Sequence, residues 1–199
     1  AFKPKHPFVF ILGGAKFSTK IPLVKKFLKL ADSLYITGAL ANSFFKKMGY
    51  EVGKSVVDLD DTKIKPFIKE KKIVLPDDVV VSGPKGKRAC LPTEVRKDEY
   101  IYDVGPKSVE RLAQDIKSSK MVLWNGPLGK YEKGFTDGTE GLAKAIAGSD
   151  AYSILGGGDT VAAVEKLGLS DRFSFISTGG GAMLDFLAKG TLPGLRALQ

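Results

Sequence analysis

Short β-rich runs alternate along this chain with stretches of helical spacing, and this alternation constrains the fold more than any other feature. In Ile21–Leu30, for example, apolar residues recur every three or four positions, which would place them on one face of a helix. Strands that alternate with helices pair in parallel through helical crossovers, so the pattern predicts an α/β fold. The six β-rich runs are Phe8–Leu12, Ser33–Ile36, Glu99–Tyr102, Met121–Trp124, Tyr152–Leu155 and Phe173–Ile176.

We therefore expect a doubly wound, Rossmann-like, mainly parallel six-stranded sheet with helices on both faces. Residues Ile73–Val95 do not follow this alternation, and their short β-rich runs separated by turn residues predict a small β-hairpin inserted between the repeats. The length of 199 residues suits one such domain, so we treat residues 1–199 as a single unit. The other predicted helices are Leu40–Met48, Val109–Ile116, Thr139–Ile146, Thr160–Leu167 and Ala182–Leu187.

Glycine follows nearly every predicted strand. In a parallel sheet these strand ends share one edge, which is where doubly wound folds bind ligands. Two triple-glycine segments, Gly156–Gly158 and Gly179–Gly181, lead directly into predicted helices, whose unpaired N–H groups and dipole favour an anion. We interpret this edge as a phosphate site, although a single glycine could equally serve a tight turn. The other glycines at strand ends are Gly13, Gly14, Gly38, Gly105 and Gly126.

A few polar residues near these glycines could contribute to such a site. Lys16 and Lys20 stand four residues apart before a helix and could clamp a polyphosphate, or they could be solvated surface. Asp159 could hold Mg²⁺, with Thr160 and nearby amides on phosphate oxygens, or it could simply cap a helix.

The segment LWNGPLGKYE adds two further candidates. Asn125 could donate to a phosphate, and Glu132 could accept hydrogen bonds from ribose hydroxyls. A structural turn with a surface glutamate is the alternative.

Composition and missing motifs narrow the function classes. A net charge of +9 favours anionic partners. Cys90 is the only cysteine, which excludes an internal disulfide and fits a reducing, cytoplasmic setting, and the only histidine, His6, is expected on the surface. No apolar run is long enough to span a membrane, no signal-peptide pattern opens the chain, and the start at Ala1 suggests a piece of a longer protein. Neither a P-loop nor a full dinucleotide fingerprint is present.

Four motifs in this order resemble phosphoglycerate kinase, specifically its carboxyl-terminal nucleotide-binding half: GGAK-x-x-x-K-I, WNGP-x-G-x-[FY]E, GGGDT and STGGGA. The likeness extends over essentially all 199 residues, including YITGALANSF, LPDDVVV and YDVGPKS. Members of that family consist of two Rossmann-like domains. They transfer a phosphoryl group between 1,3-bisphosphoglycerate and Mg-ADP, giving 3-phosphoglycerate and ATP.

The resemblance implies roles for individual residues. Lys16 would contact the transferring phosphoryl group and Lys20 the terminal nucleotide phosphate, while Gly180 and its neighbours would face the transferred group. Asp159 would coordinate Mg²⁺, and Asn125 and Glu132 would contact the phosphates and the ribose. The adenine slot would comprise Gly14, Gly38, Tyr102, Pro127 and Leu128. The phosphates would lie against Gly156, Gly157, Gly158 and Thr160.

The same resemblance implies that the half that binds phosphoglycerate is absent from these residues. We therefore expect a monomer that binds ADP or ATP with Mg²⁺ but is essentially inactive alone, and we expect neither nucleic acid nor membrane as a partner. Phosphoryl transfer between an acyl phosphate and a nucleotide needs no proton removed, which agrees with the lack of a histidine base. The alternative is a non-catalytic nucleotide- or dinucleotide-binding Rossmann-like module.

Overall fold

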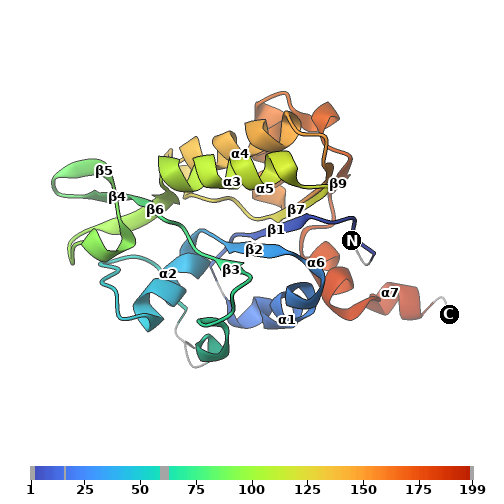
Figure 1. The fold of residues 1–199 in the computed structure, drawn as a ribbon, viewed down its shortest axis with the longest axis horizontal. Coiled ribbons are helices and arrows are strands. Elements are labelled where there is room, and N and C mark those ends of the chain that lie inside the picture. The colour runs from blue at the N-terminus through green and yellow to red at the C-terminus, as the bar shows by residue number, and fades with distance from the viewer. Residues whose placement is uncertain (1–2, 16, 59–62, 198–199) are drawn as a thin grey trace.

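The main sheet has six strands, all parallel, in the order β3-β2-β1-β7-β8-β9. A computed structural model, which describes residues 3–15, 17–58 and 63–197, shows this sheet between two layers of helices (Figure 1). The doubly wound parallel sheet predicted from the sequence is thus confirmed. Its strands are β1 (Phe8–Leu12), β2 (Ser33–Ile36), β3 (Ile73–Val74), β7 (Met121–Asn125), β8 (Tyr152–Gly156) and β9 (Phe175–Ser177).

The strand order reverses between β1 and β7, which lie side by side at the centre of the sheet. The chain proceeds from β1 outward to β2 and β3, and later from β7 outward to β8 and β9. Helices that follow β1 and β7 therefore diverge, which opens a crevice beyond the carboxyl ends of these two strands. In doubly wound folds the end of the two strands at such a reversal is where ligands usually bind, so this edge near β1 and β7 is the first place to look for a site.

Helices cover both faces of the sheet (Figure 1). On one face α3 (Pro106–Ser118), α4 (Asp137–Ala147) and α5 (Gly158–Lys166) enclose a core around the fully buried Trp124. On the other face α1 (Ile21–Leu30), α2 (Ala39–Lys47) and α6 (Gly180–Lys189) enclose a core rich in phenylalanine. The strands between these layers are mostly apolar, and β1 (FVFIL) is apolar throughout, because a parallel sheet buries both faces. The short helix α7 (Pro193–Arg196) follows α6.

One predicted strand belongs to a different sheet. The run predicted at Glu99–Tyr102 forms β6 (Tyr100–Val104), which pairs antiparallel with β4 (Val79–Gly83) in a separate three-stranded sheet. The sixth strand of the main sheet is instead Ile73–Val74, which we had assigned to the inserted hairpin. Parallel pairing needs a crossover of a dozen or more residues, usually a helix, and the described structure has no α-helix between β4 and β6. The predicted hairpin itself is confirmed as β4 with β5 (Gly86–Cys90).

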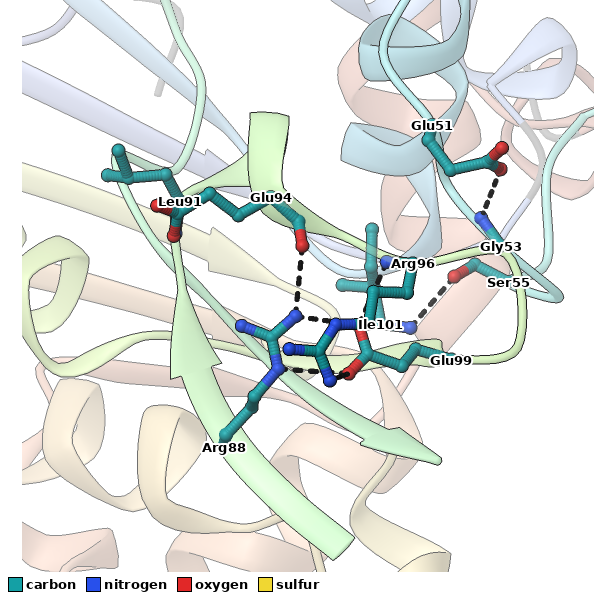
Figure 2. A network of polar contacts seen from close by, with 9 residues as sticks. All are labelled: Glu51, Gly53, Ser55, Arg88, Leu91, Glu94, Arg96, Glu99 and Ile101. Atoms are coloured by element: carbon teal, nitrogen blue, oxygen red, sulfur yellow. Dashed lines mark hydrogen bonds and ion pairs between the residues drawn. The ribbon is translucent and has the colours of Figure 1, made fainter. Parts of the chain in front are cut away.

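A buried carboxylate holds this small sheet together (Figure 2). Glu99 is 3% exposed, and its two oxygens accept hydrogen bonds from the Arg88 side chain at 2.9 and 2.8 Å. The backbone N–H of Arg96 donates to the same carboxylate at 2.9 Å. These bonds from Arg88 hold the pKa of Glu99 below its usual range. The Arg88–Glu99 pair thus ties β5 to the segment that leads into β6.

Short 3₁₀ turns join several elements: η1 (Ser18–Lys20), η3 (Lys65–Phe67), η4 (Pro92–Glu94), η5 (Tyr131–Lys133) and η6 (Ser170–Arg172). None of the described helices is both long and apolar enough to cross a membrane. His6 is exposed, as predicted, and precedes the amino end of β1, away from the crevice. Its Nδ1 lies 2.6 Å from a carboxylate oxygen of Asp32.

Candidate functional site

A cavity of about 320 Å³ lies beyond the carboxyl end of the main sheet, between α2, β6 and the segment after β7. This volume is within the range of small-molecule sites. Seven residues predicted from the sequence line it: Gly14, Gly38, Tyr102, Pro127, Leu128, Glu132 and Asp159. The predicted adenine-slot residues therefore lie together, with the predicted ribose and metal residues beside them.

Close backbone contact between the ends of β1 and β7 forms the floor of this region. A Cβ atom on Gly13 would lie 2.3 Å from the carbonyl oxygen of Pro127, and one on Gly126 would lie 2.7 Å from the backbone of Gly13. The Gly13 N–H also donates to the Asn125 carbonyl at 2.8 Å. Only glycine permits this approach, so packing alone requires the glycines after both strands.

The first triple-glycine segment ends β8 and begins α5, next to the cavity. Gly157 has a φ of +101°, a conformation that few other residues adopt, and this turn sets the direction of α5. Among the described residues, none accepts a hydrogen bond from the backbone N–H of Gly157 or Gly158. These two donors and the positive end of α5 are therefore available to an anion. Asp159, in the first turn, is exposed and also lines the cavity.

Asn125 lies against this segment from the neighbouring strand. It is 4% exposed, it pairs with Gly156 in the sheet register, and its side-chain Nδ2 has no hydrogen-bond partner in the described structure. That nitrogen would lie 3.3 Å from a Cβ on Gly157, so it sits directly beside the turn. A buried donor without a partner is costly, and a ligand oxygen at the start of α5 would satisfy it.

Thr160 has a structural role in this conformation. It is fully buried, and its Oγ1 accepts a hydrogen bond from the Gly126 N–H at 3.1 Å. The hydroxyl thereby ties the first turn of α5 to the turn after β7. Because the Thr160 oxygen only accepts in this bond, its role at the phosphates stays a prediction.

The second triple-glycine segment lies on the same edge of the sheet, because β9 pairs with β8 in parallel and Gly156 is level with Ser177. Gly180, with a φ of +40°, begins α6. In the described part of the chain, no acceptor faces the backbone N–H of Gly180 or Gly181. Met183 of α6 packs on Gly156, where a Cβ would lie 2.2 Å from the methionine methyl group. The two segments thus present free N–H groups to one side of the molecule.

Gly105, by contrast, has no connection with the crevice. It precedes α3, and a Cβ there would lie 2.2 Å from the carboxyl carbon of Asp78. That carboxylate accepts hydrogen bonds from the N–H groups of Lys107 and Ser108 and caps α3. The glycine therefore makes room for a helix cap supplied from another segment.

The model of the phosphoglycerate kinase family matches residues 1–190 of this chain. The chain belongs to the phosphoglycerate kinase family. It is 43% identical over 203 residues to the phosphoglycerate kinase of Haemophilus influenzae, which covers 99% of this chain and 53% of the relative. It is 44% identical over 200 residues to that of Baumannia cicadellinicola subsp. Homalodisca coagulata, covering 98% of this chain and 52% of the relative.

A solved phosphoglycerate kinase structure supports the same fold. The enzyme from Coxiella burnetii superposes with a TM-score of 0.89 at 38% sequence identity, over 98% of this chain and 53% of that chain. The chain thus spans about half the length of the phosphoglycerate kinases that it matches.

Of the two lysines predicted in the site, the structure describes only Lys20. Lys16 lies outside the described residues. Lys20 ends η1 and precedes the first residue of α1, and burial lowers the pKa of its ammonium group. Neither Lys20 nor Asn125 lines the cavity itself, nor do Thr160, Gly180 or the first triple-glycine segment.

Sequence reasoning missed several residues that line the cavity. Asp103, the second-last residue of β6, is 4% exposed. Burial raises the pKa of its carboxyl to about 7, although hydrogen bonds from the N–H groups of Gly138 and Val104 act in the opposite direction. Asn42, on the buried side of α2, is 2% exposed. Asp103 lies in YDVGPKS and Asn42 in YITGALANSF, two of the stretches that resemble the family. A polar residue within an otherwise apolar run was the available signal.

Proposed function

We propose that this chain is the nucleotide-binding half of a phosphoglycerate kinase and that its cavity binds the adenosine part of ADP or ATP. The observation that carries the proposal is the continuity between the cavity and the start of α5. Asp159 belongs to both, since it lines the cavity and lies in the first turn of that helix. A nucleotide has the matching form, with a flat aromatic base at one end and a polyphosphate at the other.

The residues present supply the contacts such a ligand needs. Gly14, Gly38 and Tyr102 line the base end together with Pro127 and Leu128. Glu132 is exposed, with one carboxylate oxygen 3.8 Å from the Lys130 ammonium, and would accept from the ribose hydroxyls. The polyphosphate would extend toward the N–H groups of Gly157 and Gly158, the Asn125 amide and Lys20.

Magnesium fits the residues present. Among the described residues, no group of three or more His, Cys, Asp or Glu side chains could form a metal cage by itself. Mg²⁺ usually takes one or two carboxylates together with substrate phosphates, and Asp159 is exposed where it could provide one. A bound Mg²⁺ would be held by Asp159 and would supply neutralisation of the phosphate charge.

The reaction proposed is phosphoryl transfer between 1,3-bisphosphoglycerate and ADP. The nucleotide phosphate, already an anion, would attack the phosphorus of the acyl phosphate, and the carboxylate of 3-phosphoglycerate would leave as the P–O bond breaks, so no group in the site has to remove a proton. Catalysis would then rest on positioning and on charge neutralisation by backbone N–H groups and lysine side chains. The free N–H groups of the second triple-glycine segment, around Gly180, and Lys16 would face the transferring group.

We further propose that these residues make a single nucleotide-binding domain whose phosphoglycerate-binding partner domain lies in the other half of the relatives. The chain by itself should then bind nucleotide, as a monomer, and show negligible turnover. Rapid ATP formation from 1,3-bisphosphoglycerate by the 199-residue chain alone would contradict this part of the proposal.

Calorimetry of nucleotide binding tests the proposal. Asp159→Ala should weaken binding of Mg-ADP more than binding of ADP measured in the presence of EDTA, because only the former uses the carboxylate–metal contact. Glu165→Ala removes the same charge from the exposed far end of α5 and should leave both affinities unchanged. Equal losses for Asp159→Ala in the two titrations would reject the metal role. Binding of NADH in preference to ADP would favour a dinucleotide-binding module instead.

A further inference from the structure

The positive charge of this chain is concentrated in two segments. Residues 16–31 and 63–72 contain ten of the 31 basic residues, all of them lysines, and a single acidic residue, Glu70. The rest of the chain carries 21 basic and 21 acidic residues, so these two segments account for the whole net charge of +9. Asp60 and Asp61, which precede the second segment, lie outside the described residues.

The fold places the two segments side by side. The rings of Phe17 and Phe67, one from each segment, are in edge contact with their centroids 5.5 Å apart. The Lys72 ammonium, at the end of the second segment, donates to the carbonyl oxygens of Leu28 and Ala31 at the end of α1, at 3.1 and 2.8 Å. The buried apolar side chains of both segments belong to one core cluster. The two lysine-rich segments therefore form one region of the molecule.

The lysines of this region face outward, because the apolar side chains of both segments face the core. Five of the exposed lysines have no carboxylate partner in the described part of the chain. Elsewhere Lys87, Lys144 and Lys189 each lie beside a carboxylate. Asp32, the first carboxylate after α1 in the sequence, is paired with His6. We call the five the lysine surface: Lys25, Lys29, Lys65, Lys69 and Lys71.

The lysine surface is separate from the nucleotide cavity. Helix α1 runs back from the carboxyl edge of the sheet to the amino edge, where β2 begins, and the Leu34 N–H of β2 donates to the Lys72 carbonyl at 2.8 Å. Lys29 in the last turn of α1 and Lys71 before β3 therefore lie near the amino edge. None of these five described lysines lines the cavity. A partner bound to the lysine surface would thus leave the carboxyl edge open.

The side chains of this region indicate what kind of anion it fits. Neither segment contains arginine, the side chain that typically grips a phosphate with two parallel hydrogen bonds. Phe17, Phe27 and Phe67 are buried, so the bases of a nucleic acid would find no ring to stack on. No large apolar side chain is exposed among the described residues of either segment, so nothing would insert into a bilayer. What remains is a group of long, hydrated ammonium side chains, which suits an extended anionic surface.

We propose that the lysine surface binds the anionic headgroups of a lipid bilayer and holds the protein at a membrane by electrostatic attraction alone. Clusters of about four to eight basic residues on an amphipathic helix are typical of binding to anionic lipids, and each lysine near such a surface strengthens binding about fivefold. This inference departs from the expectation, drawn from the sequence, that no membrane is a partner, because only the fold brings the two segments together. It does not depend on the proposed nucleotide function.

Sedimentation with lipid vesicles tests the inference. The 199-residue chain should bind vesicles that contain about one third phosphatidylglycerol, and it should not bind vesicles of phosphatidylcholine alone. Raising the salt from about 0.1 M to about 1 M shortens the Debye length from about 10 Å to about 3 Å and should release the protein. The inference would be overturned by a lack of binding to the anionic vesicles at the lower salt, by equal binding to both kinds of vesicle, or by binding that survives the higher salt.

Two double variants separate the lysine surface from net charge. Lys25→Gln/Lys29→Gln should bind the anionic vesicles about twentyfold more weakly than the unaltered protein. Lys107→Gln/Lys117→Gln removes the same charge from exposed lysines of α3, on the other face of the sheet, and should bind almost as well as the unaltered protein. Equal losses in the two variants would show that net charge alone drives binding, which would overturn the inference.

A second pair of lysines and a competing anion complete the test. Lys65→Gln/Lys69→Gln removes two charges from the second segment and should show the same twentyfold loss, and it decides the matter if circular dichroism shows that the α1 variant does not fold. A short DNA duplex, supplied at the same phosphate concentration as the anionic lipid, is the alternative partner. Tighter binding to the duplex than to the vesicles would identify a nucleic acid site and overturn the assignment to lipid.

Discussion

The stability of this protein should depend on pH through Asp103, and replacing that residue by asparagine should remove the dependence. Burial raises the pKa of the Asp103 carboxyl to about 7, from an ordinary value of 3.8. In the unfolded chain the carboxyl would titrate near its ordinary value. Between these two pH values the folded protein holds a proton that the unfolded chain has released. The free energy of unfolding therefore falls as the pH rises from about 4 to about 7, and it levels off above that.

The size of the effect follows from this difference in pKa. Each unit of pKa difference corresponds to about 1.4 kcal/mol, so the full difference amounts to about 4 kcal/mol as an upper limit. Most of the change in the proton bound by folded Asp103, over the pH range convenient for denaturation experiments, lies between pH 5 and pH 7. Integrating the proton uptake over that interval gives a loss of about 2 kcal/mol. The bonded Glu99 does not interfere, because its pKa is lowered by Arg88 and its contribution changes at more acidic pH.

Urea denaturation at pH 5, 6 and 7 measures this loss in the unaltered protein and in Asp103→Asn, which should lose the slope. Asp78→Asn is the matched control, since Asp78 is also a buried carboxyl that bonds backbone N–H groups at the start of a helix. It reports what the loss of such a cap does by itself. An unfolding free energy that is flat between pH 5 and pH 7, or a slope that persists unchanged in Asp103→Asn, would refute the reasoning.

Two further changes probe the packing that shapes the site. Gly13→Ala should lower the free energy of unfolding by about 3 kcal/mol, because every close neighbour of the added Cβ is backbone, whereas Gly194→Ala, with nothing within 4 Å, should change it little. Circular dichroism on thermal unfolding distinguishes the two. Arg88→Met should cost about 3 kcal/mol at pH 7 by leaving the Glu99 carboxylate buried without its partner. That deficit should shrink as the pH falls and Glu99 takes up a proton, and a deficit equally large at pH 4 would contradict the assignment.

Local patterns in the sequence were sufficient for most elements and for the edge at which the site lies. The helix predicted over Ile21–Leu30 has those bounds in the structure, and the strand predicted at Phe8–Leu12 is likewise confirmed. Both are set by side chains a few residues apart, through helical spacing or through continuous burial. The glycines after the strands then indicated the carboxyl edge, because parallel strands bring their ends together there.

Strand partners and buried polar contacts depended on residues that are distant in the chain, and only the tertiary structure decided them. A β-rich run such as Tyr100–Val104 does not specify which sheet it joins, since pairing depends on the connection and on a neighbour 20 or so residues away. The hydrogen bond between the Gly126 N–H and the Thr160 hydroxyl could not be predicted, because the two residues lie 34 positions apart. The buried, unpaired oxygen of Asn42 is likewise known only from the structure, in which the other half of the amide donates to Val56. Residue type and spacing thus indicated the class of ligand to expect, an anion at the carboxyl edge of the sheet. Long-range packing determined which polar groups near that edge have no partner within the protein.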